Sequence, residues 1–350
     1  MALTVVDQGL LGTNAQYTGF KNRIINGAMV IDQRNAGASG TAVNVYTVDR
    51  WQYGASVSSK GTWQQNAGAV TPPAGFSNYL GFTSSSAYSV SATDFFTFSQ
   101  VIEGFNFADM AWGTASAATV TLSFWVRSSL TGTFGGALKN SASTRSYPFS
   151  YTISTANTWE QKTITIVGDT SGTWVGATNG GGVSVIFGLG VGSTYNGTAG
   201  AWAGTQYLSA TGATSVVGTN GATFYITGVQ LEKGSTATSF DYRPYGTELA
   251  LCQRYYQVLV AGEYLAAFAY STNRVLAGIT YTNRMRTTPT ATGAATLFQY
   301  YTPGVAQTSS AISMSPNATG LVNLDVTITA TSGAAGIGGT QSSIALSAEL

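Results

Sequence analysis

The chain contains no histidine, and this absence excludes several kinds of chemistry. Histidine is the usual general base, the commonest metal ligand and the side chain that most often titrates near neutral pH. A serine–histidine–aspartate triad is therefore impossible. Cys252 is the single cysteine, so an intrachain disulfide and a thiolate metal cluster are excluded as well. We expect no metal, no cofactor and no catalytic residue.

Charged residues are scarce. They make up 8% of the 350 residues, against about 25% in an ordinary soluble domain. Lys and Arg (15) nearly balance Asp and Glu (14), so the sequence offers no basic field for nucleic acid. Long apolar runs are missing too, and we expect no membrane insertion. Residues 1–30 lack the pattern of a cleaved signal peptide, which predicts a protein assembled in a cytoplasm.

The chain has instead a repeated strand–turn–strand texture that starts at Val43. Its clearest alternation is TVTLSFWVRS, residues 119–128, where every second side chain from Val120 to Val126 is apolar. Many strands without helices, each with one apolar face, predict an all-β, two-sheet sandwich over residues 43–245. We expect its strands at residues 43–57, 78–83, 95–102, 119–128, 145–153, 159–167, 182–191 and 223–232. The alternation changes phase at Gly228, which predicts a β-bulge there.

A short helix is expected after the sandwich. Thr247 can cap it, Glu248 suits its first turn, and Leu251 and Tyr255 are spaced to share a face. Cys252 falls inside this pattern and is predicted to be a buried, inert thiol. With the helix, residues 246–350 are expected to form a smaller C-terminal β domain. Its predicted strands lie at residues 263–270, 274–282, 295–301, 320–330 and 342–348.

Residues 1–42 show little periodicity and contain several glycines. A loose terminus is the ordinary interpretation of such a segment. However, Val5, Leu10, Phe20 and Ile24 are apolar, and a free tail would expose them to water. We therefore predict an extended N-terminal attachment arm that is ordered by another chain.

Two parts of the sequence resemble segments that recur in structural proteins of tailed bacteriophages and prophages, commonly tail fibres. The first is NRIINGAMVIDQR at residues 22–34, followed by YTVDRW at residues 46–51. The second is VQLEKGSTATSFDYRPYGTELALCQRYYQ at residues 229–257. The resemblance implies a virion component that is not an enzyme. It also implies a jelly roll of the carbohydrate-binding-module type between the two motifs.

On this basis we expect a homotrimeric tail or tail-associated fibre, located in the virion and assembled in the host cytoplasm. The arm would bind other phage tail or connector proteins, and the β domains would bind a host-surface glycan. Two alternatives stay open. One is a purely architectural neck or head fibre. The other is a glycan-degrading enzyme, which would need two facing carboxylates from a set that the sequence does not bring together: Asp94, Glu103, Asp109, Glu160 and Asp169.

Aromatic residues supply the candidates for glycan binding. All seven tryptophans precede residue 203, and Trp51 and Trp159 fall in strand patterns, so we expect them to be buried. Trp and Tyr present a flat apolar face beside a polar group, which suits stacking against sugar rings. The better surface candidates lie in loops rich in Gly and Thr: Trp174, Tyr195, Trp202 and Tyr207. For these four residues we give equal weight to contact with a glycan or another subunit and to plain packing within the fold.

Charges concentrate in the two motifs, although the chain is otherwise poor in charge. Arginine–carboxylate pairs of this kind often fix a junction between domains. We prefer that interpretation to a ligand site for the six residues Asp49, Arg50, Glu232, Asp241, Arg243 and Arg254.

Overall fold

The computed structural model describes residues 20–259, 264–280, 283–293, 298–302, 305–316, 321–327, 335–340 and 343–350. The chain divides into two compact units, residues 1–245 and 246–350. Strands dominate both units, and α1 (Tyr245–Gln253) is the one α-helix in the described part of the chain. Within that part, no helix combines the length and the apolar character needed to cross a membrane.

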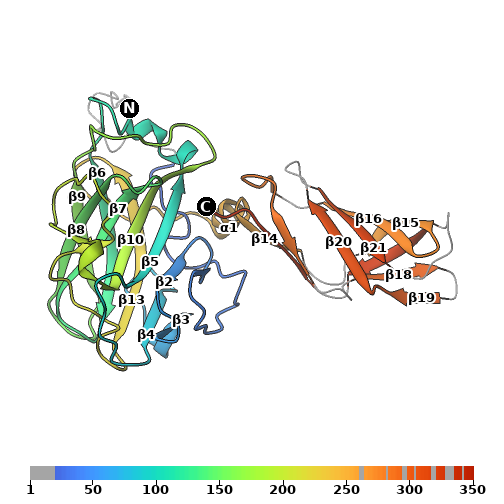
Figure 1. Cartoon of the computed structure of the whole chain (residues 1–350), viewed down its shortest axis with the longest axis horizontal. Helices are drawn as coiled ribbons and strands as arrows, with labels where there is room; N and C mark the ends of the chain where they lie inside the picture. The colour runs from blue at the N-terminus through green and yellow to red at the C-terminus, as the bar shows by residue number, and fades with distance from the viewer. Residues whose placement is uncertain are drawn as a thin grey trace, which may run out of the picture. The chain divides into compact units, whose positions relative to one another are not determined.

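The first unit is a sandwich of two antiparallel sheets, as the alternating pattern predicts (Figure 1). The larger sheet has the order β1 (Val45–Tyr46), β2 (Gln52–Ala55), β5 (Phe95–Glu103), β10 (Gly181–Val191), β7 (Gly132–Asn140), β8 (Ser146–Ile153). The smaller sheet has the order β3 (Gly61–Gln65), β4 (Leu80–Ser84), β13 (Thr223–Lys233), β6 (Val120–Ser128), β9 (Glu160–Ile166). A short parallel pair, β11 (Asn196–Gly197) and β12 (Ser209–Ala210), lies in the loop after β10.

The core of this unit lies between the two sheets and is rich in aromatic rings. On β6, Val120, Leu122, Phe124 and Val126 are fully buried, which confirms the predicted alternation. The Phe124 ring meets Phe187 of β10 with centroids 5.0 Å apart, so the two sheets interdigitate directly. Edge-to-face pairs of this kind add to the stabilisation that burial of apolar area provides.

Gly228 produces the predicted bulge in β13. Its φ is +60°, a conformation that glycine adopts at little cost. The pairing of β13 with β6 shifts between Thr227 and Gln230. Because of this shift, Ile226 before the bulge and Val229 after it both point into the core and are fully buried.

The described N-terminal residues differ from the prediction of an arm. Ile24 and Met29 are fully buried in the core of the first unit. The backbone N–H of Ile25 donates to the side chain of Gln100 (2.9 Å), whose amide donates back to the Ile25 carbonyl (2.7 Å). The expectation of an arm ordered by another chain is therefore corrected for residues 20–42, because Ile24, Ile25, Met29 and Ile31 are buried by their own chain. Residues 1–19 of the predicted arm lie outside the described residues.

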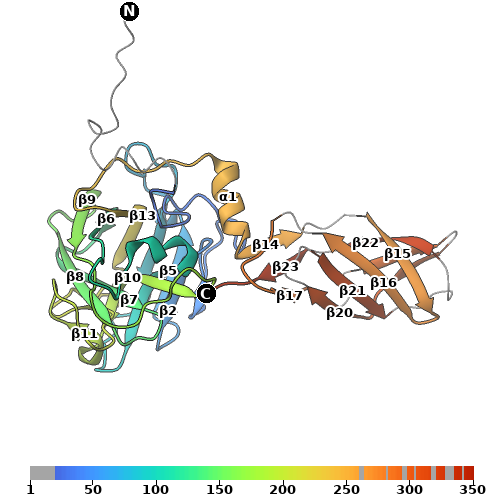
Figure 2. The ribbon, with the colours of Figure 1, turned by 90° about the horizontal axis from the view of Figure 1, so that it is seen from above.

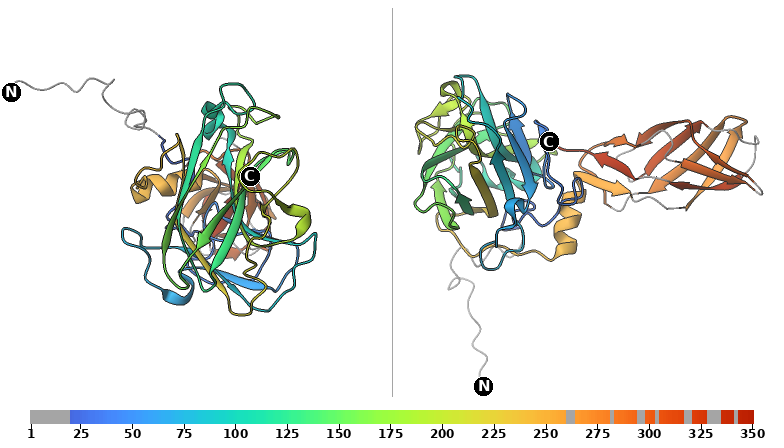
Figure 3. Two further views of the ribbon diagram at one scale, coloured as in Figure 1. Left: turned by 90° about the vertical axis from the view of Figure 1, so that its left-hand side faces the viewer. Right: turned by 90° about the horizontal axis from the view of Figure 1, so that it is seen from below.

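The second unit starts with α1 and continues as two antiparallel sheets (Figure 3). The smaller sheet has the order β14 (Tyr256–Leu259), β23 (Ile344–Ser347), β17 (Thr290–Thr292). The larger sheet has the order β19 (Val305–Thr308), β18 (Phe298–Thr302), β22 (Ala335–Thr340), β15 (Tyr264–Ser271), β16 (Arg274–Thr280), β21 (Leu321–Thr327), β20 (Ala311–Pro316). Cys252 is fully buried, as expected. The helix begins at Tyr245, so Thr247 lies inside it and is not the predicted cap.

Candidate functional site

The outer face of the larger sheet in the first unit carries small polar side chains. On β5, Phe96 and Phe98 are buried in the core, so the intervening Thr97 must point to the opposite face. On β10, Val185 and Phe187 point into the core in the same way, and Ser184 lies on the outer face. The alternation that builds the core therefore also builds a polar outer surface.

Strand register aligns these outer residues in rows across β2, β5, β10 and β7. Ser99 of β5 is paired with Gln52 of β2 on one side and with Ile186 of β10 on the other. In the next row, Ser184 of β10 is paired with Val101 of β5 and with Lys139 of β7. Three of these strands, β5, β10 and β7, lie side by side in Figure 2. Residues far apart in the sequence thus form one continuous surface.

The loop after β10 covers one end of this face and turns the remainder into a groove. Two glycines allow the close approach. A Cβ at Gly135 would lie 2.4 Å from the Oγ of Ser209, and one at Gly188 would lie 2.9 Å from the same atom. Such contacts are too short for any side chain, so the loop can lie against the sheet because both positions are glycine. Its residues Tyr195, Gln206 and Leu208 then form one wall.

The groove has a volume of about 300 Å³, which is near the lower end for ligand pockets. Its lining is mostly polar and uncharged, with one cation and two aromatic rings. The lining residues are Asn44, Gln52, Gly54, Phe95, Thr97, Ser99, Val101, Lys139, Ser184, Ile186, Tyr195, Gln206 and Leu208. These described residues include no aspartate and no glutamate.

This lining can recognise a polyhydroxylated ligand. Hydroxyl and amide side chains both donate and accept hydrogen bonds, and sugar hydroxyls need both kinds of partner. The rings of Phe95 and Tyr195 meet edge to face with centroids 6.1 Å apart, and both side chains are half-buried. They offer an apolar surface for the C–H groups of a sugar ring. We name this feature the sheet groove.

Lys139 is the cation of the sheet groove. Its side chain is half-buried, and its Nζ donates to the Oγ of Ser143 at 3.0 Å. Burial lowers the pKa of the Lys139 ammonium, because desolvation disfavours the charged form. Sequence reasoning missed this residue, since GTFGGALKN lacks the alternation that marks a strand.

Of the four predicted glycan-binding residues, Tyr195 lines the sheet groove. Trp174 and Trp202 instead form a tryptophan cluster with Trp112. The centroid distances are 4.8 Å for Trp112–Trp174, 5.1 Å for Trp112–Trp202 and 5.5 Å for Trp174–Trp202. The Trp174 indole donates to the Ser171 carbonyl (3.2 Å), and that of Trp202 to the Val167 carbonyl (2.7 Å).

These contacts favour packing for Trp174 and Trp202, and a glycan role for them stays a prediction. Both rings are half-buried and pack against the main core. Tyr207 packs on its own loop, because a Cβ at Gly197 would lie 2.3 Å from the Tyr207 ring. Of the two tryptophans predicted to be buried, Trp51 is fully buried and Trp159 is half-buried.

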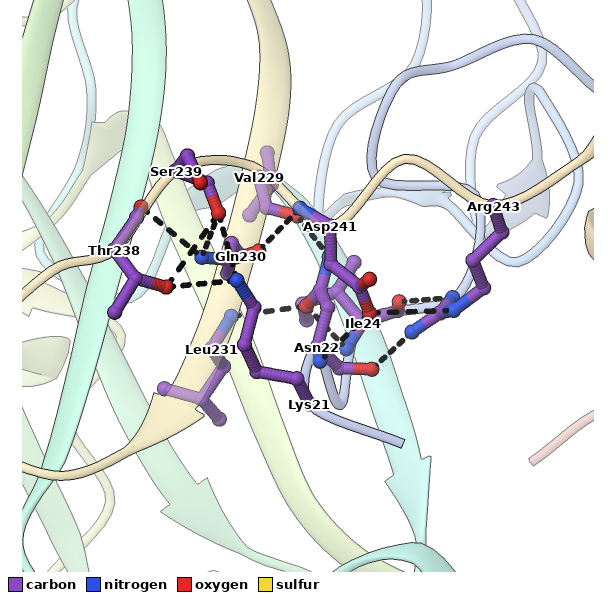
Figure 4. A network of polar contacts seen from close by, with 10 residues as sticks. All are labelled: Lys21, Asn22, Ile24, Val229, Gln230, Leu231, Thr238, Ser239, Asp241 and Arg243. Atoms are coloured by element: carbon purple, nitrogen blue, oxygen red, sulfur yellow. Dashed lines mark hydrogen bonds and ion pairs between the residues drawn. The ribbon is translucent and has the colours of Figure 1, made fainter. Parts of the chain in front are cut away.

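The two motifs that resemble phage structural proteins meet inside the first unit (Figure 4). The Asn22 side chain donates to the Val229 carbonyl (3.0 Å) and accepts from the Leu231 N–H (3.1 Å). Arg243 donates to the backbone carbonyls of Asn22 and Ile24. The N-terminal motif is therefore held against β13 and the segment that follows it by polar contacts with backbone atoms.

Five of the six predicted junction residues lie within the first unit. The Asp49 carboxylate accepts from the Gln33 backbone (3.0 Å), and Arg50 donates to the Val101 carbonyl (2.6 Å). Glu232 accepts from the Thr238 backbone (2.9 Å). Asp241 and Arg243 are part of the network of Figure 4. Arg254 lies in the second unit. A role of these six residues at the junction between the units stays a prediction.

None of the five carboxylates considered for an enzyme lines the sheet groove. The Asp169 carboxylate accepts hydrogen bonds from Nε and an η nitrogen of Arg145, each at 2.7 Å, and this pairing raises the pKa of the guanidinium. Asp109 is paired with Arg23 (2.8 Å) and Glu160 with Lys162 (2.6 Å). Among the residues with described positions, no group of three or more acidic or cysteine side chains could hold a metal ion.

No family model matches the chain, and no curated protein matches it. Several solved structures are similar. One is "Bacteriophage CBA120 tailspike protein 4 enzymatically active domain", at 11% identity and TM-score 0.33 over 61% of this chain and 21% of that chain. Another is described as "CBM4 structure and function", at 14% identity and TM-score 0.30 over 60% of this chain and 98% of that one.

A third similar structure is a putative sugar binding protein from Bacteroides thetaiotaomicron. It has 11% identity and TM-score 0.36, over 61% of this chain and 100% of that chain. The chain thus matches about a fifth of the length of the phage tailspike and nearly all of the two others. At these identities and TM-scores, the similarities carry no argument about function.

Proposed function

We propose that this chain is a structural fibre protein of a tailed-phage virion and that it binds a host-surface glycan through the sheet groove. The observation that carries the glycan part is the composition of that groove, which is lined by uncharged polar side chains together with the ring pair Phe95–Tyr195. The virion part is supported by the resemblance of residues 22–34, 46–51 and 229–257 to segments that recur in phage tail fibres.

The charge of the chain supports recognition by short-range contacts. The formal net charge is +1, so long-range attraction to a charged cell surface contributes little. Hydrogen bonds and ring contacts in one small groove give weak binding. A homotrimer would present three such grooves and convert weak sites into useful avidity, if the glycan spacing allows them to bind together.

The groove can be blocked by one substitution with a matched control. Ser99→Phe would place a ring on the outer face of β5, in the middle of the lining. Thr163→Phe would place the same ring on an exposed position of β9, in the other sheet. On an array of bacterial surface glycans, we expect the full chain and Thr163→Phe to bind the same glycans. Ser99→Phe should lose them while keeping its unfolding temperature, and undiminished binding by folded Ser99→Phe would contradict the proposal.

We propose binding without cleavage of the glycan. This part is supported by the lining of the groove, because a glycosidase ordinarily needs two carboxyl groups at the scissile bond. Prolonged incubation of the chain with a bound glycan should release no new reducing ends. Their appearance would favour the glycan-degrading alternative. Imaging the protein on the parent particle separates a tail fibre from the neck or head alternative.

We also propose that the chain assembles as a homotrimer, attached to other tail or connector proteins through its N-terminal residues. The support is the resemblance to fibre proteins and, ahead of the segment that packs on the sandwich, the apolar residues Val5 and Leu10 of the sequence. Light scattering of the purified full chain should give three times the chain mass of 36.2 kDa. A stable monomer at micromolar concentration would contradict this assembly.

A further inference from the structure

We infer that the sheet groove selects a sugar that carries a carboxylate, with the ammonium of Lys139 as the group that pairs with it. The inference rests on the glycan-binding function proposed above and goes further by naming the class of sugar. Uronic acids and sialic acids both have the required carboxylate.

The first argument is the set of partners of Lys139, compared with those of two other lysines of the first unit. Lys162 is paired with Glu160 at 2.6 Å, and its side chain is 18% exposed. Lys21 donates to Thr238 and to the Ser239 carbonyl, both at 2.8 Å. Lys139 donates one hydrogen bond, to the Ser143 hydroxyl, and has no ion pair with any described residue. An ammonium has three N–H donors, so two remain for a ligand.

The second argument is the free-energy cost of a partly buried ammonium that has no counter-charge among the described residues. A partly buried ammonium loses hydration, and only a counter-charge or further hydrogen bonds offset that loss. Burial lowers the pKa of the Lys139 ammonium, and the groove lining contains no carboxylate that would counteract this effect. In a chain with 8% charged residues, the groove holds a cation that the fold does not neutralise.

The third argument is the set of groups beside Lys139. Ser184 is its cross-strand neighbour, and Ser99 and Gln52 lie in the next row of the same face. Hydroxyl and amide groups can donate to a carboxylate while the ammonium supplies the charge-assisted bond. The lining holds no aspartate or glutamate that would repel an anionic sugar. The ring pair Phe95–Tyr195 remains available for the sugar's apolar face.

The test compares each acidic sugar with its own methyl ester, which removes the carboxylate charge and keeps the sugar. The probes are oligogalacturonate and its methyl ester, with sialyllactose and its methyl ester as a second pair, and affinity is measured by calorimetry on the full chain. We expect the wild-type chain to bind at least one acid about tenfold or more tightly than its neutral counterpart, the factor expected from one charge-assisted hydrogen bond. Lys139→Met should abolish this preference, and Lys139→Arg should restore most of it.

Lys162→Met is the matched control, because it also removes one lysine charge from a strand of the first unit. It should keep the preference for the acid. Equal binding of acid and neutral forms by the wild-type chain, or a preference that survives in Lys139→Met, would overturn the inference. Binding of neutral glycans would then leave the proposed glycan-binding function intact. If the array detects no glycan at all, the proposed function fails, and the inference fails with it.

Discussion

The two sheets of the first unit differ in how their outer faces are covered. On the smaller sheet, the Tyr225 ring is covered by Tyr79, with centroids 5.2 Å apart, and Trp159 packs 5.5 Å from Tyr79. These rings form a second small core outside the sandwich. On the larger sheet, the loop after β10 covers one end and leaves the sheet groove open.

The difference follows from the size of the outward side chains. Tyr225 of β13 is large enough to pack against another ring, and Gly81 beside it lets Ala67 approach the sheet. Thr97, Ser99 and Ser184 are small and polar, so they offer an aromatic ring little apolar surface to pack against. The same sandwich thus has one outer face that stabilises the fold and another that is available to a ligand.

The largest expected effect is on the covered face. Tyr79 is fully buried, and its hydroxyl donates to the Ala67 carbonyl at 2.6 Å. Tyr79→Ala should lower the free energy of unfolding of the first unit by about 3–5 kcal/mol, because it leaves a cavity and removes two ring contacts. Denaturant unfolding followed by tryptophan fluorescence measures this, since all seven tryptophans lie in the first unit.

Tyr195→Ala is the matched change in the sheet groove. Tyr195 is half-buried there, so we expect a loss of less than about 1 kcal/mol in stability and weaker glycan binding. Similar stability losses for the two tyrosines would contradict the contrast between the two faces.

For the tryptophan cluster we expect a stability loss between those of Tyr79→Ala and Tyr195→Ala. Trp202 is half-buried, contacts Trp112, Trp174 and Tyr147, and donates its indole N–H to Val167. Trp202→Ala should cost about 2 kcal/mol in unfolding free energy, and Trp202→Phe less, because it retains a ring. An exposed glycan-binding ring would give almost no stability loss but a clear loss of glycan binding. That result would restore the sequence-based hypothesis for Trp202.

The smallest effect concerns the rim of the sheet groove and depends on pH. The Asp94 carboxylate accepts hydrogen bonds from the Ser91 N–H (2.9 Å), the Tyr88 hydroxyl (2.8 Å) and the Ser56 hydroxyl (3.0 Å). The bond from the Ser91 backbone is the main cause of a pKa below its ordinary value of 3.8, with the Tyr88 hydroxyl next. Ser56 also accepts from the N–H of Phe95, which lines the groove.

Because the folded pKa of Asp94 is lowered, its contribution to stability is present above the unfolded pKa and disappears as the pH falls through the folded pKa. Asp94→Asn should therefore be less stable than the wild-type chain at neutral pH, by less than about 1 kcal/mol. The difference should narrow below about pH 3.8. A stability difference independent of pH would show that the charge of Asp94 does not anchor this rim.

Much of the sandwich could be predicted from the sequence, because burial of one face forces alternation. The predicted segments 119–128 and 182–191 match β6 and β10 within one residue at each end. β7 was missed because its glycines interrupt the pattern. Those glycines allow close packing, because a Cβ at Gly136 would lie 2.4 Å from the Phe149 ring and a Cβ at Gly135 would lie 2.4 Å from the Ser209 Oγ.

The sheet groove could not be predicted, because strand register brings its residues together. Gln52, Ser99 and Ile186 come from three strands that are distant in the sequence. Alternation marks each of them as outward but does not say which neighbours they meet. Tyr195 was identified because it is an aromatic residue in a loop rich in Gly and Thr. Trp202 has the same sequence signal and packs differently, since contacts between loops leave no periodic pattern.

Hydrogen exchange of the full chain with and without a bound glycan tests the central claim most directly. The account predicts that the glycan slows exchange of amides in β2, in residues 95–101 of β5 and at the loop residues Tyr195, Gln206 and Leu208, which line the sheet groove. Amides of β6 and β9 in the other sheet should exchange at unchanged rates. Protection confined to β6, β9 or the second unit, with no change around the sheet groove, would contradict the account.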